Sequence, residues 1–316
     1  MMVDAASRDS ILVIKLAALG DFVQAFAPFG AIRAWHPDAE ITLLTTAPFA
    51  ALAKASPWFD HVWSDGRPDW TDLPGVARLA MKLAMGRFKR VYDLQTSSRS
   101  SRYRLFVGLR AEWSGIAVGA SHRDTDPSRN LLHTTERQRA QLAGAGIIRF
   151  PTPSLDWLTA DLSDFGLPEK YALLLPGASQ GRPAKRWPAA RYGELATLLP
   201  MPAVICGVVS ERELAHRIQR SCPTALDLTG QTDLIQLAAI AKQATLTVGN
   251  DSGPTHLAAA MGARTLCLFG SESDPALCAP RGTNVTIMAS DRLADLSVRQ
   301  VIDALAPEGG RYLWPP

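Results

Sequence analysis

Short apolar runs alternate with longer amphipathic stretches along nearly the whole chain, and this alternation restricts the fold more than any other feature. Runs such as ILVIKL (11–16) and EITLLTT (40–46) have the length and residue types of buried strands. The stretches after them, 21–35 and 48–56, repeat apolar residues at helical spacing. The same pattern predicts strands at 61–64, 90–94, 113–118, 171–177, 203–208, 246–250 and 265–270, and helices at 75–89 and 133–145. Strands that alternate with helices predict an α/β fold, with parallel sheets covered on both faces.

The alternation is interrupted once, near the middle of the chain. Residues 147–170 carry three prolines and no regular period, which is typical of an inter-domain linker. The pattern starts again at YALLLPG (171–177), and 316 residues are many for a single core. We therefore predict an N-terminal domain at 1–155, a C-terminal domain at 156–300 and a tail at 301–316 that can pack back on the first domain.

The composition excludes several classes of protein. A hydrophobic content of 47% with 20% charged residues is typical of a globular protein. No stretch reaches the roughly 18 apolar residues of a membrane span, and the start MMVDAASRDS lacks the basic region of a signal peptide. The cysteines show no metal-ligand spacing and are predicted to be buried thiols in a reducing compartment: Cys206, Cys222, Cys267 and Cys278. We expect a soluble, cytoplasmic protein.

The segment TLTVGNDSGPTHLAAAMG (245–262) joins a strand to a helix through small polar residues. A helix N-terminus presents unpaired N–H groups and a partial positive charge, so it favours an anion. Gly253 allows a ligand to approach the backbone closely. Asp251 or Ser252 can also serve only as an N-cap, and a lone histidine such as His256 is more often structural than catalytic.

Two further strand ends in the second half carry polar or charged residues. LLLPGASQGRPAKRWP (173–188) places Ser179 in a glycine-rich turn and Lys185 just before a helix, a composition that suits a phosphate group. ICGVVSERE (205–213) contains Glu211, whose carboxylate can accept hydrogen bonds from the two hydroxyls of a ribose. A glutamate in a first helical turn can also simply complement the helix dipole.

These segments resemble the glycosyltransferase family 9 heptosyltransferases of lipopolysaccharide inner-core synthesis. The matching segments follow the family's order: LGD (19–21), DLQ (93–95), PGAS…PAKRWP (176–188), GVVSE (207–211) and GNDSGPTHLAAAMG (249–262). The resemblance covers nearly the whole chain. It implies the GT-B architecture: two Rossmann-like domains, each with a parallel sheet, that face each other across a cleft. It also implies a nucleotide-sugar donor in the C-terminal domain and inverting transfer without a metal or other cofactor.

The resemblance assigns roles to the polar residues of the C-terminal domain. Lys185 matches the lysine that contacts the donor diphosphate, Glu211 the acid near the donor nucleoside, and Asp251 the aspartate that contacts the donor sugar. A carboxylate beside a diphosphate would repel it, so Asp251 is expected to face sugar hydroxyls. The remaining donor-binding residues are then Ser179, Ser252, Gly253 and His256.

Asp21 lies just after the first predicted strand, in VIKLAALGDFVQ. The family's aspartate here is the proposed general base, which takes the proton from the acceptor hydroxyl. An acid in the first turn of a helix is the structural alternative, and His256 is the competing base. Ala17 and Ala18 stand where hydroxyl residues are common in the family. The absence of G-x-G-x-x-G after this strand argues against a nicotinamide enzyme.

A basic segment follows in the N-terminal half. Between residues 78 and 110 the chain has nine cationic side chains and one acid, Asp93. Arg99, Arg102 and Arg104 interleave with serines after a strand end, and arginines of this kind suit phosphate and carboxylate groups. We predict that they bind an anionic acceptor. A solvated helix face is the alternative for part of the segment, and nucleic acid fits less well because no binding module accompanies the charge.

The predicted activity is therefore the transfer of a heptose, or a related sugar, from ADP-heptose to a lipopolysaccharide core acceptor at the cytoplasmic face of the inner membrane. A GT-B transferase that uses another nucleotide sugar for another surface glycan is one alternative. A nucleotide-sugar 2-epimerase is a second, although the chain lacks an evident further set of acids and a histidine for hydrolysis. A non-catalytic nucleotide-sugar-binding protein is a third, and the presence of Asp21 argues against it.

Overall fold

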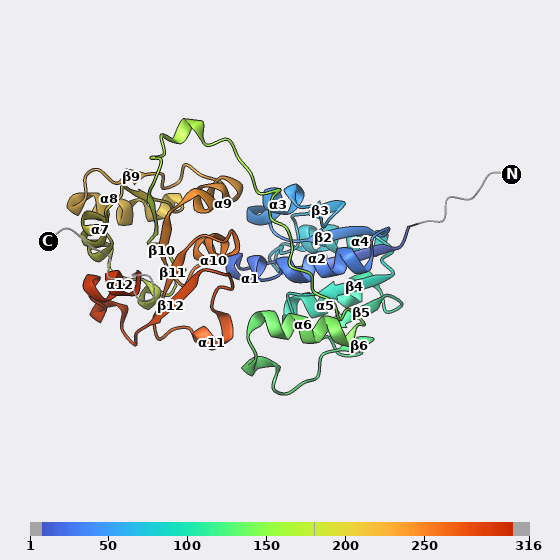
Figure 1. Cartoon of the computed structure of the whole chain (residues 1–316). Helices are drawn as coiled ribbons and strands as arrows, with labels where there is room; N and C mark the ends of the chain where they lie inside the picture. Colours follow the sequence, from blue (N-terminus) through green and yellow to red (C-terminus); the bar gives the residue numbers. More distant parts are fainter. Residues whose placement is uncertain (1–7, 180, 306–316) are drawn as a thin grey trace. The chain divides into compact units, whose positions relative to one another are not determined.

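The computed structural model describes residues 8–179 and 181–305 and divides the chain into two units, Met1–Trp157 and Leu158–Pro316 (Figure 1). Each unit has its own parallel sheet, and helices connect most of the successive strands. The predicted α/β class is confirmed in both units. The boundary lies within the proline-containing segment that the sequence marks as a linker.

Six strands form the sheet of the first unit within residues 8–157, in the order β3-β2-β1-β4-β5-β6. The strands are β1 (Ser10–Ile14), β2 (Glu40–Leu44), β3 (His61–Trp63), β4 (Arg90–Asp93), β5 (Glu112–Gly115) and β6 (His122–Arg123). The central strand β1 pairs in parallel with both β2 and β4. Its apolar run Ile11–Ile14 is almost completely buried, as the hydrophobic pattern predicts.

Helices of the first unit follow the strands in the βα order. They are α1 (Leu19–Val23), α2 (Phe26–Trp35), α3 (Ala47–Ala55), α4 (Leu73–Met85), α5 (Ser98–Val107) and α6 (Thr134–Gly144), with a short 3₁₀ turn η1 (Arg129–Leu131). The single helix predicted at 21–35 is wrong, because the chain forms α1 and α2 with a break between them. The break places Phe22, Phe26 and Phe29 in one aromatic cluster with Trp58.

The second unit repeats the architecture within residues 158–305, with strand order β12-β11-β10-β7-β8-β9. Its strands are β7 (Ala172–Leu175), β8 (Ala203–Ile205), β9 (Leu226–Asp227), β10 (Leu246–Asn250), β11 (Thr265–Phe269) and β12 (Val285–Ala289). Its helices are α7 (Ala189–Leu198), α8 (Arg212–Ser221), α9 (Leu234–Gln243), α10 (Gly253–Ala260), α11 (Pro275–Cys278) and α12 (Val298–Leu305), with 3₁₀ turns η2 (Ser163–Phe165), η3 (Pro183–Lys185), η4 (Val209–Glu211) and η5 (Leu293–Asp295).

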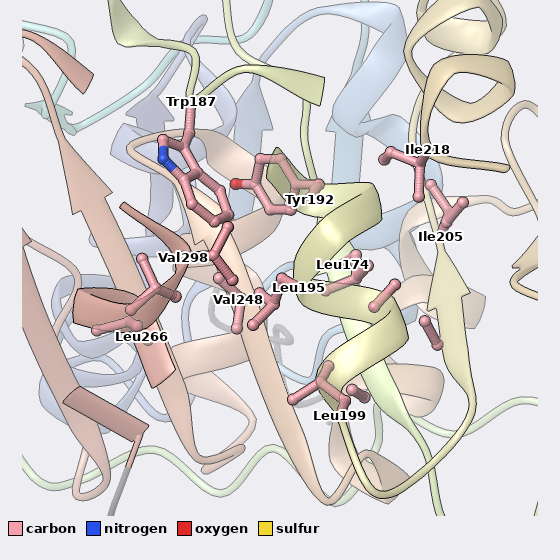
Figure 2. Packing of buried hydrophobic residues seen from close by; sticks show 14 of the residues in the cluster. Leu174, Trp187, Tyr192, Leu195, Leu199, Ile205, Ile218, Val248, Leu266 and Val298 are labelled. Carbon is pink, nitrogen blue, oxygen red and sulfur yellow. The ribbon is translucent and has the colours of Figure 1, made fainter. Parts of the chain in front are cut away.

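The core of the second unit lies between its sheet and α7. Leu174 and Val248 from neighbouring strands meet Tyr192 and Leu195 of α7, as Figure 2 shows. Val298 of α12 closes the same core. Buried apolar side chains on the strands and on α7 hold the ends of the strands in place. Polar loops at those ends therefore start from rigid positions.

Two predictions need revision at the level of single elements. Residues 301–305 of the expected tail belong to α12, and Val301, Ile302 and Leu305 are packed in the core of the second unit, while the rest of 301–316 lies outside the described residues. Cys206, Cys222 and Cys267 are buried free thiols, as predicted, but Cys278 is only half-buried because α11 lies near the surface. In the part of the chain that the structure describes, no helix is long and apolar enough to cross a membrane.

Candidate active site

Lys185 and Asp251 meet at the carboxyl edge of the second sheet. Lys185 ends the turn η3 after β7, and Asp251 follows β10 directly. The Lys185 Nζ lies 2.5 Å from Asp251 Oδ2, and the side chains are only 12% and 5% exposed. Ser273 Oγ donates to the same oxygen at 2.6 Å, and His256 Nε2 lies 3.4 Å from Oδ1. Three side chains, two from loops and one from helix α10, therefore converge on the Asp251 carboxylate.

The charge of Asp251 is fixed by these partners. Burial alone would raise the pKa of its carboxyl, but hydrogen bonds from His256, Lys185 and Ser273 outweigh burial and lower the pKa to about 2. Asp251 is therefore ionised at neutral pH. An ionised carboxylate accepts hydrogen bonds and donates none, which suits a partner that carries hydroxyl groups.

Asn250, the last residue of β10, joins the loop between β7 and α7 to the core. Its Oδ1 accepts the backbone N–H of Trp187 at 3.0 Å and the Tyr192 hydroxyl at 3.1 Å. Its Nδ2 donates to the carbonyl of Pro176 at 2.7 Å. The buried amide of Asn250 thus holds both ends of the loop from Pro176 to Trp187. Because Asn250 directly precedes Asp251, the same contacts fix the backbone from which Asp251 projects.

The N-terminus of α10 carries the features of an anion site. Ser252 is the N-cap residue in extended conformation, and its side chain makes no capping hydrogen bond. Its Oγ instead lies 3.2 Å from the Thr255 hydroxyl, which donates to the carbonyl of Asn250 at 2.7 Å. The first-turn N–H groups and the helix dipole therefore remain available to a negative group. Gly253 begins this turn and adds no side chain of its own.

Glu211 is held against the ends of β7 and β8. Its Oε2 accepts the N–H of Val208 at 2.9 Å. A Cβ added to Gly177 would lie 2.0 Å from Oε1, and one added to Gly207 would lie 2.6 Å from Oε2. Burial raises the pKa of Glu211, while the Val208 N–H and Arg186 lower it. Because both positions are glycines, the carboxylate can pack directly against the ends of the two strands. A glutamate that only complemented the helix dipole would not need this close packing.

Neighbouring cations in the loop after β7 have different roles. Arg186 donates to the carbonyl of Ala178 at 2.8 Å and closes the loop on itself, whereas Lys185 points to Asp251. Ser179 is exposed at the tip of the same loop. Composition alone does not distinguish the two cations; the structure places Lys185 in the carboxylate cluster and Arg186 within the loop.

Asp21 lies in α1 of the first unit, at the edge of a polar cavity of about 210 Å³. Its Oδ2 accepts the N–H of Ala18 at 3.3 Å. The loop before it is held from the side, because Gln95 Oε1 accepts the N–H groups of Leu16 and Ala17 at 2.8 and 3.1 Å. The Asp21 carboxylate therefore caps the start of α1 and also lines the cavity.

Lys15 lies beneath this cavity and is only 3% exposed. Its Nζ donates to the carbonyl of Leu94 at 3.1 Å. Burial lowers the pKa of Lys15, while Asp21 and Asp93 raise it. Burial also raises the pKa of Asp93 to about 6, against the N–H groups of Thr96 and Gln95. Lys15 was not predicted from the sequence, because one lysine after an apolar strand usually marks the point where the chain reaches solvent.

Further polar side chains line the same cavity, which the sequence analysis also missed. Arg129 pairs with Asp124 at 2.7 Å, and Arg137 donates to the Thr134 hydroxyl at 2.8 Å. Gln138 is 4% exposed, and its Oε1 is a buried acceptor without a hydrogen-bond donor in the described residues. The only sequence signal was the mixed polar segment at 128–141. Nothing local in it indicates that it meets the β1 loop.

Arg99, Arg102 and Arg104 lie on α5 and do not line the cavity of Asp21. Arg99 donates to the carbonyl of Pro68 at 2.7 Å and stacks on Trp70, 4.4 Å from the ring centre. Arg104 donates to the carbonyls of Val118 and Gly119. Arg102 is exposed, with its guanidinium 5.6 Å from the Trp70 ring. Two of the three arginines thus hold neighbouring loops, and their predicted role toward an acceptor stays a prediction.

The predicted donor residues divide into two groups at the edge of the second sheet. Lys185, Asp251, Ser252, Gly253 and His256 are brought together around the start of α10. Ser179 and Glu211 belong to the neighbouring loops after β7 and β8. Ser273 and Asn250 complete the site, and neither was selected from the sequence.

The two parallel six-stranded sheets give the fold of a GT-B glycosyltransferase, and comparison with known proteins identifies its family. The family model described as glycosyltransferase family 9 (heptosyltransferase) matches residues 76–301. The chain belongs to glycosyltransferase family 9.

Individual relatives agree with this assignment. The chain is 28% identical to lipopolysaccharide heptosyltransferase 2 of Escherichia coli, over 83% of each sequence. It is 24% identical to the lipopolysaccharide core heptosyltransferase OpsX of Haemophilus influenzae, over 82% of this chain and 78% of the relative. The solved structure of E. coli ADP-heptose lipopolysaccharide heptosyltransferase II matches with a TM-score of 0.78 and 24% identity, over 94% of this chain and 97% of that chain. The predicted GT-B fold and glycosyltransferase activity are confirmed.

Proposed function

We propose that the protein transfers a heptose from ADP-heptose to an anionic lipopolysaccharide-core acceptor, with inversion and without a metal ion. The observation that carries the proposal is the Asp251 cluster: an ionised carboxylate held by Lys185 beside an uncapped helix N-terminus. The names of the relatives supply the sugar and the acceptor class. The reaction takes place in the cytoplasm, at the membrane that carries the acceptor, and involves no nucleic acid.

On the donor side, the cation and the carboxylate of one cluster bind different parts of the donor. Lys185 and the first-turn N–H groups of α10 take the diphosphate, since both favour an anion. Asp251 accepts hydrogen bonds from hydroxyls of the donor sugar, because a carboxylate beside the diphosphate would repel it. His256 and Ser273 hold Asp251 in place for that contact. Glu211 binds the ribose hydroxyls, and Ser179 lies over the phosphates.

On the acceptor side, Asp21 acts as the general base. The acceptor oxygen forms a bond to the anomeric carbon as its proton passes to the Asp21 carboxylate. The bond from that carbon to the diphosphate oxygen breaks, and its electron pair leaves with ADP. Attack on the face opposite the leaving group inverts the configuration. The leaving charge is stabilised by Lys185 and by the N-terminus of α10.

The proposal is tested by incubating the purified protein with ADP-heptose and a deacylated core acceptor, and by mass spectrometry of the product. One added heptose is expected. The same assay with UDP- and GDP-linked sugars tests the alternative of a different donor. Binding of ADP-heptose with no product from any core acceptor would favour a nucleotide-sugar-binding protein. Mass spectrometry of the core from a gene-deletion strain would identify the missing residue.

The acceptor's negative group has two candidate binding places in the first unit: the cavity cations Arg129 and Arg137, and the α5 arginines. We expect Arg137→Gln to raise the KM for the acceptor about tenfold or more, the scale of a lost charge-assisted hydrogen bond. Arg102→Gln, the exposed member of the α5 group, should change that KM less with a soluble acceptor. Initial rates at varied acceptor and saturating donor check this. The reverse order would favour the site predicted from the sequence.

We also expect transfer to survive EDTA. Lys185 and the helix N-terminus neutralise the leaving diphosphate in place of a divalent cation. Asp124 and Asp126 have a spacing that could hold a cation, but Asp124 pairs with Arg129, and Asp126 accepts hydrogen bonds from Ser128. Rates measured before and after chelation test the expectation. Loss of activity that magnesium or manganese restores would contradict it.

A further inference from the structure

The outward surface of α4 and α5 in the first unit is apolar and positively charged. The exposed apolar side chains are Leu73, Met81, Met85 and Leu105, each 59–72% exposed. The helices pack against each other and share one core beneath, with Leu79, Leu83 and Tyr103 buried in it. We call this surface, Leu73 to Met85 and Ser98 to Val107, the α4–α5 face.

Helix α4 is apolar on both of its sides, which is unusual for a helix at a protein surface. Leu79 and Leu83 point into the core, while Ala77, Met81 and Met85 recur at helical spacing on the exposed side. A surface helix normally presents charged and polar groups to water, and a contiguous exposed apolar patch marks an interaction site. The exposed side of α4 therefore suits a partner that offers an apolar surface or interior.

Cations outnumber acids around this apolar patch, although Asp72 caps the start of α4 and Asp65 pairs with Lys82. Between Leu73 and Arg110 the only acid is Asp93, which is completely buried. Arg78 and Arg87 are exposed and, among the residues the structure describes, form no ion pair. Lys82 and Lys89 pair with Asp65 and Asp9 instead. The partner is therefore apolar in its interior and negatively charged at its surface.

We infer that the α4–α5 face binds an anionic lipid bilayer, with Met81, Met85 and Leu105 at the level of the head groups and the arginines against lipid phosphates. Apolar side chains that enter the interface and basic residues that meet anionic lipid give additive binding. A second copy of the chain fits less well, because a two-fold contact through this face would oppose arginine to arginine.

The α4–α5 face is continuous with the cavity that Asp21 lines. Gln95 and Thr96 line that cavity, and Ser97 caps the N-terminus of α5 by accepting the N–H of Ser100. The start of α5 is therefore continuous with the cavity wall that carries Asp21. A bilayer against the face would hold the sugar head of a lipid-anchored acceptor near the cavity. This last step rests on the proposed function, whereas binding of the bilayer does not.

Co-sedimentation of the full-length protein with vesicles tests the inference without donor or acceptor. We expect binding to phosphatidylcholine vesicles that contain phosphatidylglycerol, and at least about tenfold weaker binding to phosphatidylcholine alone or at high salt. Met85→Glu should weaken binding at least about tenfold, because it places a negative charge in the interface. Ile148→Glu is the matched control: Ile148 is 74% exposed and Met85 72%, and Ile148 lies outside the face. The control should bind as the unaltered protein does.

Other outcomes would overturn the inference. These are equal binding to neutral and anionic vesicles, no binding, or unchanged binding by Met85→Glu. Sedimentation velocity would overturn it in a different way, if the protein alone were a dimer that Met85→Glu dissociates. With a soluble acceptor, Met85→Glu should turn over normally. Vesicle binding by a protein with no transferase activity would support the face and contradict the proposed function, so the two failures are distinguishable.

Discussion

Replacement of Asp21 by asparagine is expected to lower kcat at least about a hundredfold, because general-base assistance contributes typically 10²–10⁴-fold. Asparagine is nearly isosteric and can still accept the Ala18 N–H through its oxygen, a contact that is 3.3 Å in this structure. The start of α1 should therefore remain in place while the base is lost. Donor affinity should change by a small factor only, since Asp21 belongs to the first unit. Single-turnover rates and ADP calorimetry measure both quantities.

His256 provides the comparison for this prediction. Its ring contacts Asp251 and is 5% exposed. His256→Ala should therefore weaken donor binding or stability more than it slows the chemical step. Near-normal turnover of Asp21→Asn together with complete loss of turnover in His256→Ala would exchange the roles of the two residues.

Replacement of Lys185 by alanine should produce the second large effect. Loss of a charge-assisted hydrogen bond to the diphosphate should weaken ADP binding by about 1.5–3 kcal/mol. The same change leaves Asp251 without its cationic partner, and breaking a buried ion pair costs about 3–5 kcal/mol. Because Ser273 and His256 still contact the carboxylate, we expect the lower end of that range in the free energy of unfolding. Calorimetry and denaturant unfolding measure the two losses.

A double variant separates the two roles of Lys185. Lys185→Ala with Asp251→Ala removes both charges, so stability should recover in part relative to Lys185→Ala alone. ADP affinity should not recover, because the diphosphate still lacks its lysine. Recovery of both would mean that Lys185 serves only as the partner of Asp251, and the diphosphate would then need another cation.

The fold class was predictable because it depends on patterns that are local in the sequence. Buried parallel strands such as β1, β7 and β10 are continuous apolar runs, and the segment after β10 brings Asp251 to the start of α10 within a few residues. The elements that were missed have weaker signals. β6 is two residues long, and β12 at the sheet edge is only partly buried, so neither forms a fully buried apolar run.

The missed site residues depend on contacts between distant parts of the chain. Ser273 lies 22 residues from Asp251, and Lys15 lies 79 residues from the carbonyl that it contacts. Both look ordinary in the sequence. Arg99 and Arg104 show the opposite case, because their spacing suggested a shared anion while the structure gives each a backbone carbonyl to bind. Charge patterns predict a positive surface; they do not predict which cations are already occupied.

The single amide of Asn250 limits how the donor loop can be engineered. Trp187 and Tyr192, which donate to it, are also packed in the core of the second unit, so loop geometry and core packing share the same residues. A loop grafted at 176–186 to accept another nucleotide sugar would need to present a carbonyl to Asn250 Nδ2 in the way that Pro176 does. Under the proposed function, donor specificity is therefore easier to change at side chains that project from the loop, such as Ser179, than by exchange of the loop backbone.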